Sequence, residues 1–172
     1  MSRSGGLSIV LCAALVAAVP LAAQQPPAPP VVPPGPTMAE ALKALEATRA
    51  AAAKIGVVLS CAVVDSRGDL IAVARMDGAR FFTTDVARGK AQVSAMFGQP
   101  SGAMAQFGAS PFFSNLNTAA QGRLYPIQGA LPVMRAKQLI GAIGCSGATA
   151  QQDEDAARAG LALLQRSDGD QP

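Results

Sequence analysis

The chain has no histidine, no tryptophan and a single tyrosine among its 172 residues. The lack of histidine excludes every mechanism built on an imidazole, including the Ser-His-Asp triad, histidine general bases, histidine zinc sites and the usual haem–histidine bond. Charged residues make up 15%, with no run of five or six like charges, which argues against a protein that binds nucleic acid by neutralising many phosphates. The net charge of +3 therefore does not indicate a basic patch.

The first 23 residues have the pattern of a secretory signal peptide. Arg3 supplies a positive start, an apolar run extends from Leu7 to Leu21, and Ala22 and Ala23 provide small residues before a polar stretch. We expect cleavage near Ala23 and export to the periplasm or the extracellular space, with no transmembrane segment in the mature protein. An uncleaved N-terminal anchor is the alternative.

Residues 24–36 form a linker in which seven of the eleven positions from Pro26 to Pro36 are proline. Proline fixes φ and lacks an N–H donor, so this stretch predicts a polyproline II spacer outside the core. One folded domain is expected at residues 37–166, a size typical of single domains, followed by a disordered tail at 167–172.

Local signals in the domain alternate between helix and strand. Thr37 with Glu40, and Thr149 with Gln152, have the spacing of capping boxes at helix starts, and Thr83 or Thr84 is expected to cap a further helix. Strands are predicted at 57–65, 69–76, 122–127, 131–135 and 138–146, a short helix at 101–107 and a loop at 108–121.

This order predicts an α+β fold with an antiparallel sheet of about five strands and helices packed on it. We expect the helices to cover one face. Because several outward strand positions are apolar, the other face is expected to meet a second subunit in a homo-oligomer.

Three motifs stand in order along the domain. The hairpin from Val63 to Ala79 reads V-V-D-S-R-G-D-L-I-A-V-A-R-M-D-G-A, the next helix contains G-K-A at 89–91, and the last strand and the turn after it read I-G-A-I-G-C-S-G-A-T at 140–149. These motifs resemble those of the GlcG/HbpS family of haem-degrading or haem-binding domains. The resemblance covers residues 38–165. It implies a profilin-like fold, assembly into dimers or larger rings, and for some exported members haem binding linked to redox sensing.

Two features of the chain depart from the family. Relatives in corrinoid enzymes are thought to ligate haem iron through histidine, which this chain lacks. The segment 128–132 reads Q-G-A-L-P where the family has Gly-Gly-x-Pro. The first departure puts an iron bond in doubt but leaves binding through the porphyrin faces open.

A haem site needs an apolar slot, cations for the propionates and, optionally, an axial ligand. Arginine suits a propionate because it can form a two-pronged bond to a carboxylate. Lys90 is unusual because it interrupts an apolar helical stripe, which predicts a buried stem and a head directed at an anion. Tyr125 is the tyrosine that could hold ferric iron, although half-buried packing also explains it. The predicted ligand-binding residues are Arg75, Asp77, Arg88, Lys90, Arg123 and Tyr125; Arg75 and Asp77 flank a turn and could instead pair with each other.

Cys61 and Cys145 are the cysteines that remain after signal cleavage. They fall at positions where the strand pattern calls for buried aliphatic residues, so two small core residues are one interpretation. An exported protein with two cysteines also invites a disulfide, and a redox switch is a third alternative.

Two functions follow from these observations. The first is an exported, non-catalytic binding protein for haem or a related tetrapyrrole, serving in scavenging, buffering or redox sensing. The alternative is an enzyme or accessory subunit acting on a small organic acid in a catabolic pathway.

Overall fold

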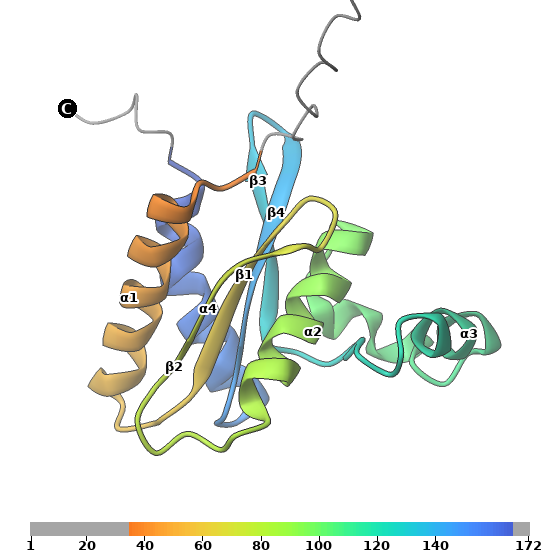
Figure 1. Ribbon diagram of the computed structural model, residues 1–172, viewed down its shortest axis with the longest axis horizontal. Coiled ribbons are helices and arrows are strands. Elements are labelled where there is room, and N and C mark those ends of the chain that lie inside the picture. The colour runs from red at the N-terminus through yellow and green to blue at the C-terminus, as the bar shows by residue number, and fades with distance from the viewer. Residues whose placement is uncertain (1–34, 167–172) are drawn as a thin grey trace, which may run out of the picture. The chain divides into compact units, whose positions relative to one another are not determined.

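The computed structural model describes residues 35–166, in which helices pack around one antiparallel sheet (Figure 1). The strands have the order β2-β1-β4-β3, so the α+β class and the antiparallel sheet are confirmed, with four strands rather than about five. In chain order the elements are α1 (Met38–Lys54), β1 (Ser60–Asp65), β2 (Leu70–Arg75), α2 (Thr83–Phe97), the 3₁₀ helix η1 (Ser101–Phe107), α3 (Pro111–Ala119), β3 (Ala130–Arg135), β4 (Gln138–Ser146) and α4 (Ala150–Leu164).

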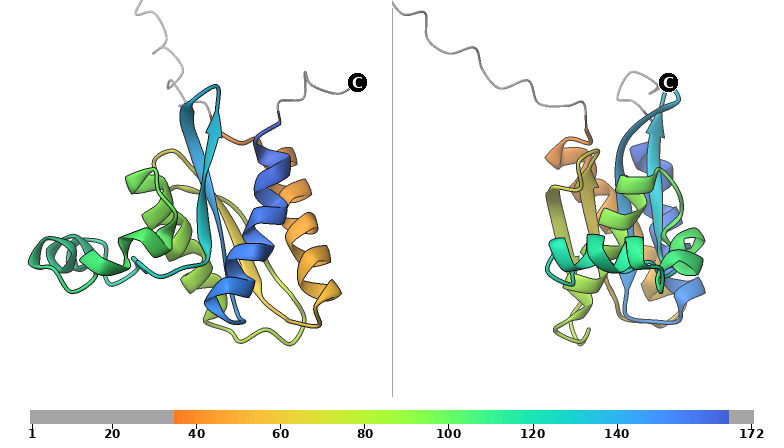
Figure 2. Two further views of the ribbon diagram at one scale, coloured as in Figure 1. Left: turned by 180° about the vertical axis from the view of Figure 1, so that it is seen from behind. Right: turned by 90° about the vertical axis from the view of Figure 1, so that its right-hand side faces the viewer.

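Helices cover both faces of the sheet, which corrects the expectation of a single covered face (Figure 2). Side chains of β1 alternate between the faces: Val63 packs in the core shared with α1 and α4, whereas Val64 packs against Ala91 and Ala95 of α2. All six residues of β1 are therefore buried. A strand with consecutive apolar residues, rather than alternating apolar and polar ones, is typical of a sheet that is covered on both faces.

Both capping boxes are confirmed. The Thr37 hydroxyl accepts from the Glu40 N–H at 3.2 Å, and the Glu40 carboxylate accepts from the Thr37 N–H at 2.7 Å. Thr149 and Gln152 form the same reciprocal pair at the start of α4. These contacts lie within four residues of chain, so local sequence is sufficient to specify them.

The predicted hairpin between β1 and β2 is also present. Asp65 closes its turn by accepting from the N–H groups of Arg67 and Asp69, both at 2.9 Å, and Gly68 adopts a φ of +85°. Only a residue without Cβ takes that conformation at little cost. A bulge between Val63 and Val64 shifts the register beside the turn.

Three local predictions were wrong. Residues 122–127 form no strand, because this segment lies against α2 instead of joining the sheet. Helix α3 occupies the expected loop, with Ser110 as its N-cap and Pro111 in its first turn. That Ser-Pro pair is a helix-start signal that sequence reasoning could have used. Helix α2 has Phe82 as its N-cap and no side-chain cap, because the Thr83 hydroxyl instead bonds the Arg80 carbonyl and Ser60.

Several boundaries lie outside the described residues. The leader at 1–23, the linker up to residue 34 and the tail at 167–172 are among them, so their predicted properties stay predictions. Within residues 35–166, no helix has the length and apolar character needed to cross a membrane.

Candidate functional site

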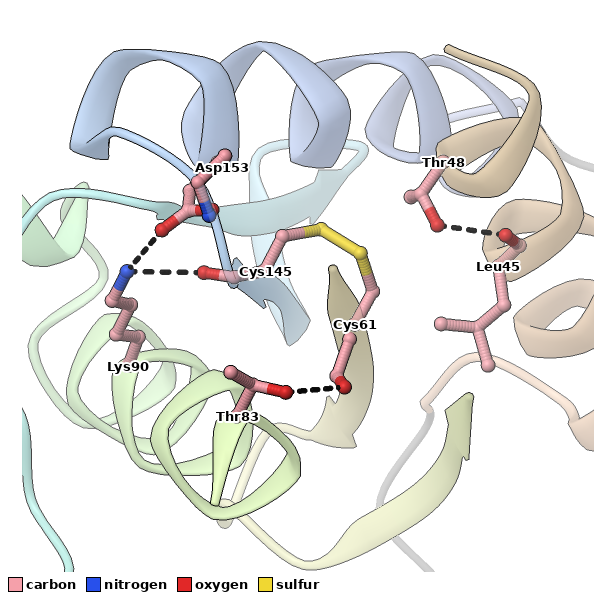
Figure 3. The surroundings of a disulfide bond; sticks show 9 residues. Leu45, Thr48, Cys61, Thr83, Lys90, Cys145 and Asp153 are labelled. Carbon is pink, nitrogen blue, oxygen red and sulfur yellow. Dashed lines mark hydrogen bonds and ion pairs between the residues drawn. A yellow bond between two sulfur atoms is a disulfide. The ribbon is translucent and has the colours of Figure 1, made fainter. Parts of the chain in front are cut away.

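Lys90 is the buried cation of the domain, as its position in an apolar stripe predicted. Its side chain is 3% exposed, and its ammonium donates to the Asp153 carboxylate at 2.9 Å and to the Cys145 carbonyl at 3.1 Å (Figure 3). Lys90 belongs to α2 on one face of the sheet, and Asp153 belongs to α4 on the other. The anion that Lys90 meets is thus part of the chain itself.

Asp153 is held by groups from the end of β4 as well as by Lys90. Its second carboxylate oxygen accepts from the Ala148 N–H at 3.0 Å. Burial raises the pKa of Asp153 above its ordinary value, and the hydrogen bonds from Lys90 and Ala148 oppose that rise without cancelling it. The Asp153 carboxylate therefore has hydrogen-bond partners for both oxygens, but its burial still disfavours the ionised form.

Gly129 makes room for the Lys90 head where β3 begins to pair with β4. A Cβ at this position would lie 2.6 Å from the Lys90 ammonium and 2.9 Å from the Cys145 carbonyl oxygen, and the glycine φ is +133°. Both facts require glycine here. The segment 128–132 differs from the family's Gly-Gly-x-Pro pattern, but it keeps Gly129, the glycine that leaves room for Lys90.

Cys61 and Cys145 are joined by a disulfide between directly paired residues of β1 and β4 (Figure 3). Their Cα atoms are 4.1 Å apart. The Cys145 N–H donates to the Gly129 carbonyl on the β3 side, so the two cysteines occupy a non-hydrogen-bonded pair, where strands approach most closely. Both residues are buried in the apolar core, and of the alternatives the disulfide is the one that the structure contains.

Four of the predicted ligand residues lie on two segments that meet at Gly89 of α2. A Cβ on Gly89 would overlap the Arg123 carbonyl oxygen and the ring atom Cδ2 of Tyr125, so the segment carrying Arg123 and Tyr125 lies directly on the helix. Arg88 and Lys90 flank that glycine, with Lys90 turned inward. Arg88 Nε is buried and has no hydrogen-bond partner among the described residues.

Arg75 and Asp77 lie apart from this group, at the end of β2. They form no ion pair with each other in the described part of the chain; Arg75 donates instead to the Ala79 carbonyl at 3.2 Å. Arg75 lines a cavity of about 220 Å³ between α1 and the β1–β2 hairpin. The structure thus divides the predicted ligand residues between two places, and their role in binding stays a prediction.

Residues 37–162 match the family model described as haem degrading protein HbpS-like. The chain belongs to the HbpS-like family. An uncharacterized 15.0 kDa protein of Citrobacter freundii, from the dhaT-dhaS intergenic region, is 34% identical over 120 residues, which cover 68% of this chain and 83% of that protein.

Solved structures carry the same fold. A double mutant of HbpS from Streptomyces reticuli is 30% identical with a TM-score of 0.68, covering 87% of this chain and 99% of that one. PduOC, solved in complex with haem, is 23% identical with a TM-score of 0.66, covering 75% and 94%. At that identity PduOC shows the shared fold alone.

Two residues of this HbpS-like domain escaped sequence reasoning. The Asp153 carboxylate is the partner of Lys90, 63 residues away, and no local signal connects the two residues. Gly89 is the contact point for Tyr125, and the helical glycine in G-K-A was its signal. Within residues 35–166, no group of three or more His, Cys, Asp or Glu residues is arranged to hold a metal ion.

Proposed function

We propose that this HbpS-like domain is an exported, non-catalytic binding protein for haem or a related tetrapyrrole. The family description supports the ligand class. The observation that carries the proposal is the half-buried Arg88 beside Gly89, whose guanidinium forms no hydrogen bond or ion pair among residues 35–166. Its terminal N–H groups therefore have donor capacity that an anionic ligand can satisfy.

The residues present fit a haem held at the surface rather than in an enclosed cavity. The cavity beside the disulfide, about 220 Å³, is smaller than typical ligand pockets of roughly 300–1,000 Å³. Three open depressions of about 400–500 Å³ reach that size, but Arg88, Arg123 and Tyr125 line none of them. Phe82, Val86 and Gly89 share one face of α2 over about 10 Å of helix, and Phe82 is exposed there. Tyr125 extends this apolar strip where its ring contacts Gly89.

Charge and an oxygen ligand complete the proposed site. Arg88 and Arg123 supply cations for propionates, and the Tyr125 hydroxyl is an oxygen that could face iron. Bound haem would supply a redox-active iron. The ammonium of Lys90 is already satisfied by Asp153, so the contacts of Lys90 favour a role in holding α2 rather than in touching the ligand.

A titration of the purified chain with hemin tests the proposal. We expect a stoichiometric Soret shift, and we expect Arg88→Ala or Arg123→Ala to weaken binding by about 1–3 kcal/mol through lost charge-assisted bonds. Tyr125→Phe should alter the Soret position if its oxygen ligates iron. Arg49→Ala, on α1 at the opposite face, is the matched control and should bind as the wild type does.

The absence of a Soret shift would reject the proposal. If small carboxylates then raise the melting temperature, and Arg88→Ala abolishes that rise, the alternative of a subunit acting on small organic acids is supported. Equal hemin affinity in all of these variants would reject the site while leaving the ligand class open.

Export and self-association belong to the same proposal. A disulfide is typical of proteins in oxidising compartments, which supports a periplasmic or extracellular location. Exposed apolar side chains on α1 and on the edge strand β2, among them Leu42 and Val73, favour a homo-oligomer. Mass spectrometry of the protein from the periplasmic fraction tests for a start near residue 24, and light scattering gives the subunit number.

A further inference from the structure

The cavity between α1 and the β1–β2 hairpin reaches the disulfide from one side. Cys61 lines its inner wall together with Leu45, Leu59 and Ala74, whereas Cys145 does not contribute to the lining. The wall is largely apolar, and its mouth carries Arg49 and Arg75. Of the two cysteines, Cys61 is therefore the one beside a space of about 220 Å³, large enough for a small molecule.

The sheet order fixes which side of Cys61 faces this space. Cys61 is paired with Cys145 of β4 on one side and with Ala74 of β2 on the other. Side chains directly opposite in paired strands point to the same face, so the Ala74 methyl group is the neighbour of the Cys61 sulfur on the side away from Cys145. Figure 3 shows the Cys61 sulfur on the side of Leu45 and Thr48, which both line the cavity.

Thiol–disulfide exchange proceeds by attack on one sulfur while the other leaves. With Cys145 on the β4 side, a nucleophile opposite the leaving group must approach Cys61 from the β2 side. A large side chain at position 74 would close that approach, but alanine leaves it open to the cavity. Both cysteines are buried, with Cys61 1% and Cys145 0% exposed, but of the two only Cys61 lines the cavity. Attack on Cys145 therefore has no comparable route.

The charge at the mouth suits an anionic reagent. Arg49 pairs with Glu46, so these two charges compensate each other. Arg75 has no acidic partner within ion-pair distance among the described residues and donates to the Ala79 carbonyl. The entrance thus carries one uncompensated positive charge, which attracts a thiolate and a carboxylate or sulfonate attached to it.

We propose that Cys61 is a site of reversible S-thiolation by small anionic thiols that enter through this cavity. The thiolate sulfur bonds to Cys61 Sγ, the Cys61–Cys145 bond breaks, and the electron pair leaves on Cys145 as a thiolate that takes a proton from water. A second thiol can then release Cys61 as a thiolate and form the external disulfide, so that two thiols together reduce the protein by two electrons. Before that second step, the Cys145 thiolate can attack Cys61 Sγ and expel the small thiolate, which restores the protein disulfide without an oxidant.

The full chain, incubated under native conditions with 2-mercaptoethanesulfonate, tests the proposal. After an acid quench and alkylation of free thiols, peptide mapping should find the mixed disulfide on Cys61 and the alkyl group on Cys145. The rate should increase linearly with thiolate concentration and remain unchanged in low urea. Cysteamine, which is cationic, should react several-fold more slowly at equal thiolate concentration, and the difference should shrink in high salt.

Paired substitutions on β2 test the route. Ala74→Leu fills the cavity beside Cys61 and should slow adduct formation at least about tenfold, since exchange depends on access to the sulfur. Val73→Leu is the matched control on the opposite face of the same strand and should react at the wild-type rate.

Three results would overturn the proposal. They are an adduct on Cys145, equal slowing in both variants, or a wild-type rate that increases with urea in parallel with global unfolding. The urea dependence decides the question even if Ala74→Leu fails to fold.

Discussion

Lys90 and Asp153 form an ion pair at 2.9 Å that connects the helices on opposite faces of the sheet. The lysine approaches from α2 and the aspartate from α4, and their side chains are 3% and 4% exposed. The pair meets at the end of β4, where the Cys145 carbonyl also accepts from Lys90. The contacts of Lys90 with Asp153 and with the Cys145 carbonyl thus connect both helices to the strand that carries the disulfide.

Removal of one partner of this pair should be severely destabilising. Asp153→Ala leaves a buried ammonium without its carboxylate, and we expect a loss of about 3–5 kcal/mol in the free energy of unfolding. The double variant Lys90→Met with Asp153→Leu should lose less than the single variant, because neither charge then remains buried. Urea denaturation measures both.

Glu46→Ala is the control for that series, since Glu46 pairs with Arg49 at the surface and no measurable loss is expected. A change of less than about 1 kcal/mol in Asp153→Ala would contradict a structural role for the pair.

The disulfide should contribute strongly to stability because it closes a long loop. The two cysteines are 84 residues apart, and the chain-entropy relation gives about 4–5 kcal/mol for a loop of that length. We expect the Cys61→Ala, Cys145→Ala double variant to lose about 2–5 kcal/mol in urea denaturation. Reductant should lower the melting temperature of the wild type and leave the double variant unchanged; a response in the double variant would implicate another target.

Gly89→Ala should destabilise the domain, although replacing a helical glycine by alanine usually stabilises a protein. Gly→Ala inside a helix normally stabilises by about 1 kcal/mol. Here the added methyl group would overlap the Arg123 carbonyl and the Tyr125 ring, so Gly89→Ala should destabilise by about 1–3 kcal/mol. The intrinsic fluorescence of the single tyrosine should change as the segment moves. A stabilised Gly89→Ala variant would contradict the observed contact.

Glu40 should make the stability of the domain sensitive to acid. Burial acts to raise the pKa of Glu40, but hydrogen bonds from Thr37 and the Arg135 guanidinium outweigh it and lower the pKa below the ordinary value of 4.5. Since the folded pKa lies below the unfolded one, this contribution is complete above about pH 4.5 and is lost as the pH falls through the folded value.

Glu40→Gln isolates that contribution. The variant should be less stable than the wild type by about 1–2 kcal/mol at neutral pH, and its stability should depend less steeply on pH in the acid range. Thermal melts between neutral pH and pH 3 measure both quantities. Glu154→Gln, whose partner Arg158 is exposed within the same helix, is the control; parallel pH profiles for Glu40→Gln and the wild type would reject the assignment.

Local signals correctly predicted the starts of α1 and α4 and the first hairpin. Thr37 with Glu40, Thr149 with Gln152, and the turn closed by Asp65 and Gly68 all depend on contacts within a few residues, which the sequence specifies directly. The family motifs predicted the fold, and the family match confirms this prediction. The interruption of an apolar stripe at position 90 correctly indicated a buried lysine, because burying an ammonium is tolerated only beside an anion.

Tertiary structure decided the partners of those residues. The pattern could not place Asp153 beside Lys90, select the disulfide for Cys61 and Cys145, or separate Arg75 from Arg88, because each choice depends on the packing of segments far apart in the chain. The segment at 122–127 has apolar residues that suit a strand, yet it packs on Gly89 of α2. Sequence alone fixed which groups must be buried or capped; the strand order β2-β1-β4-β3 fixed which groups meet, since contact across a sheet is set by register and not by distance along the chain.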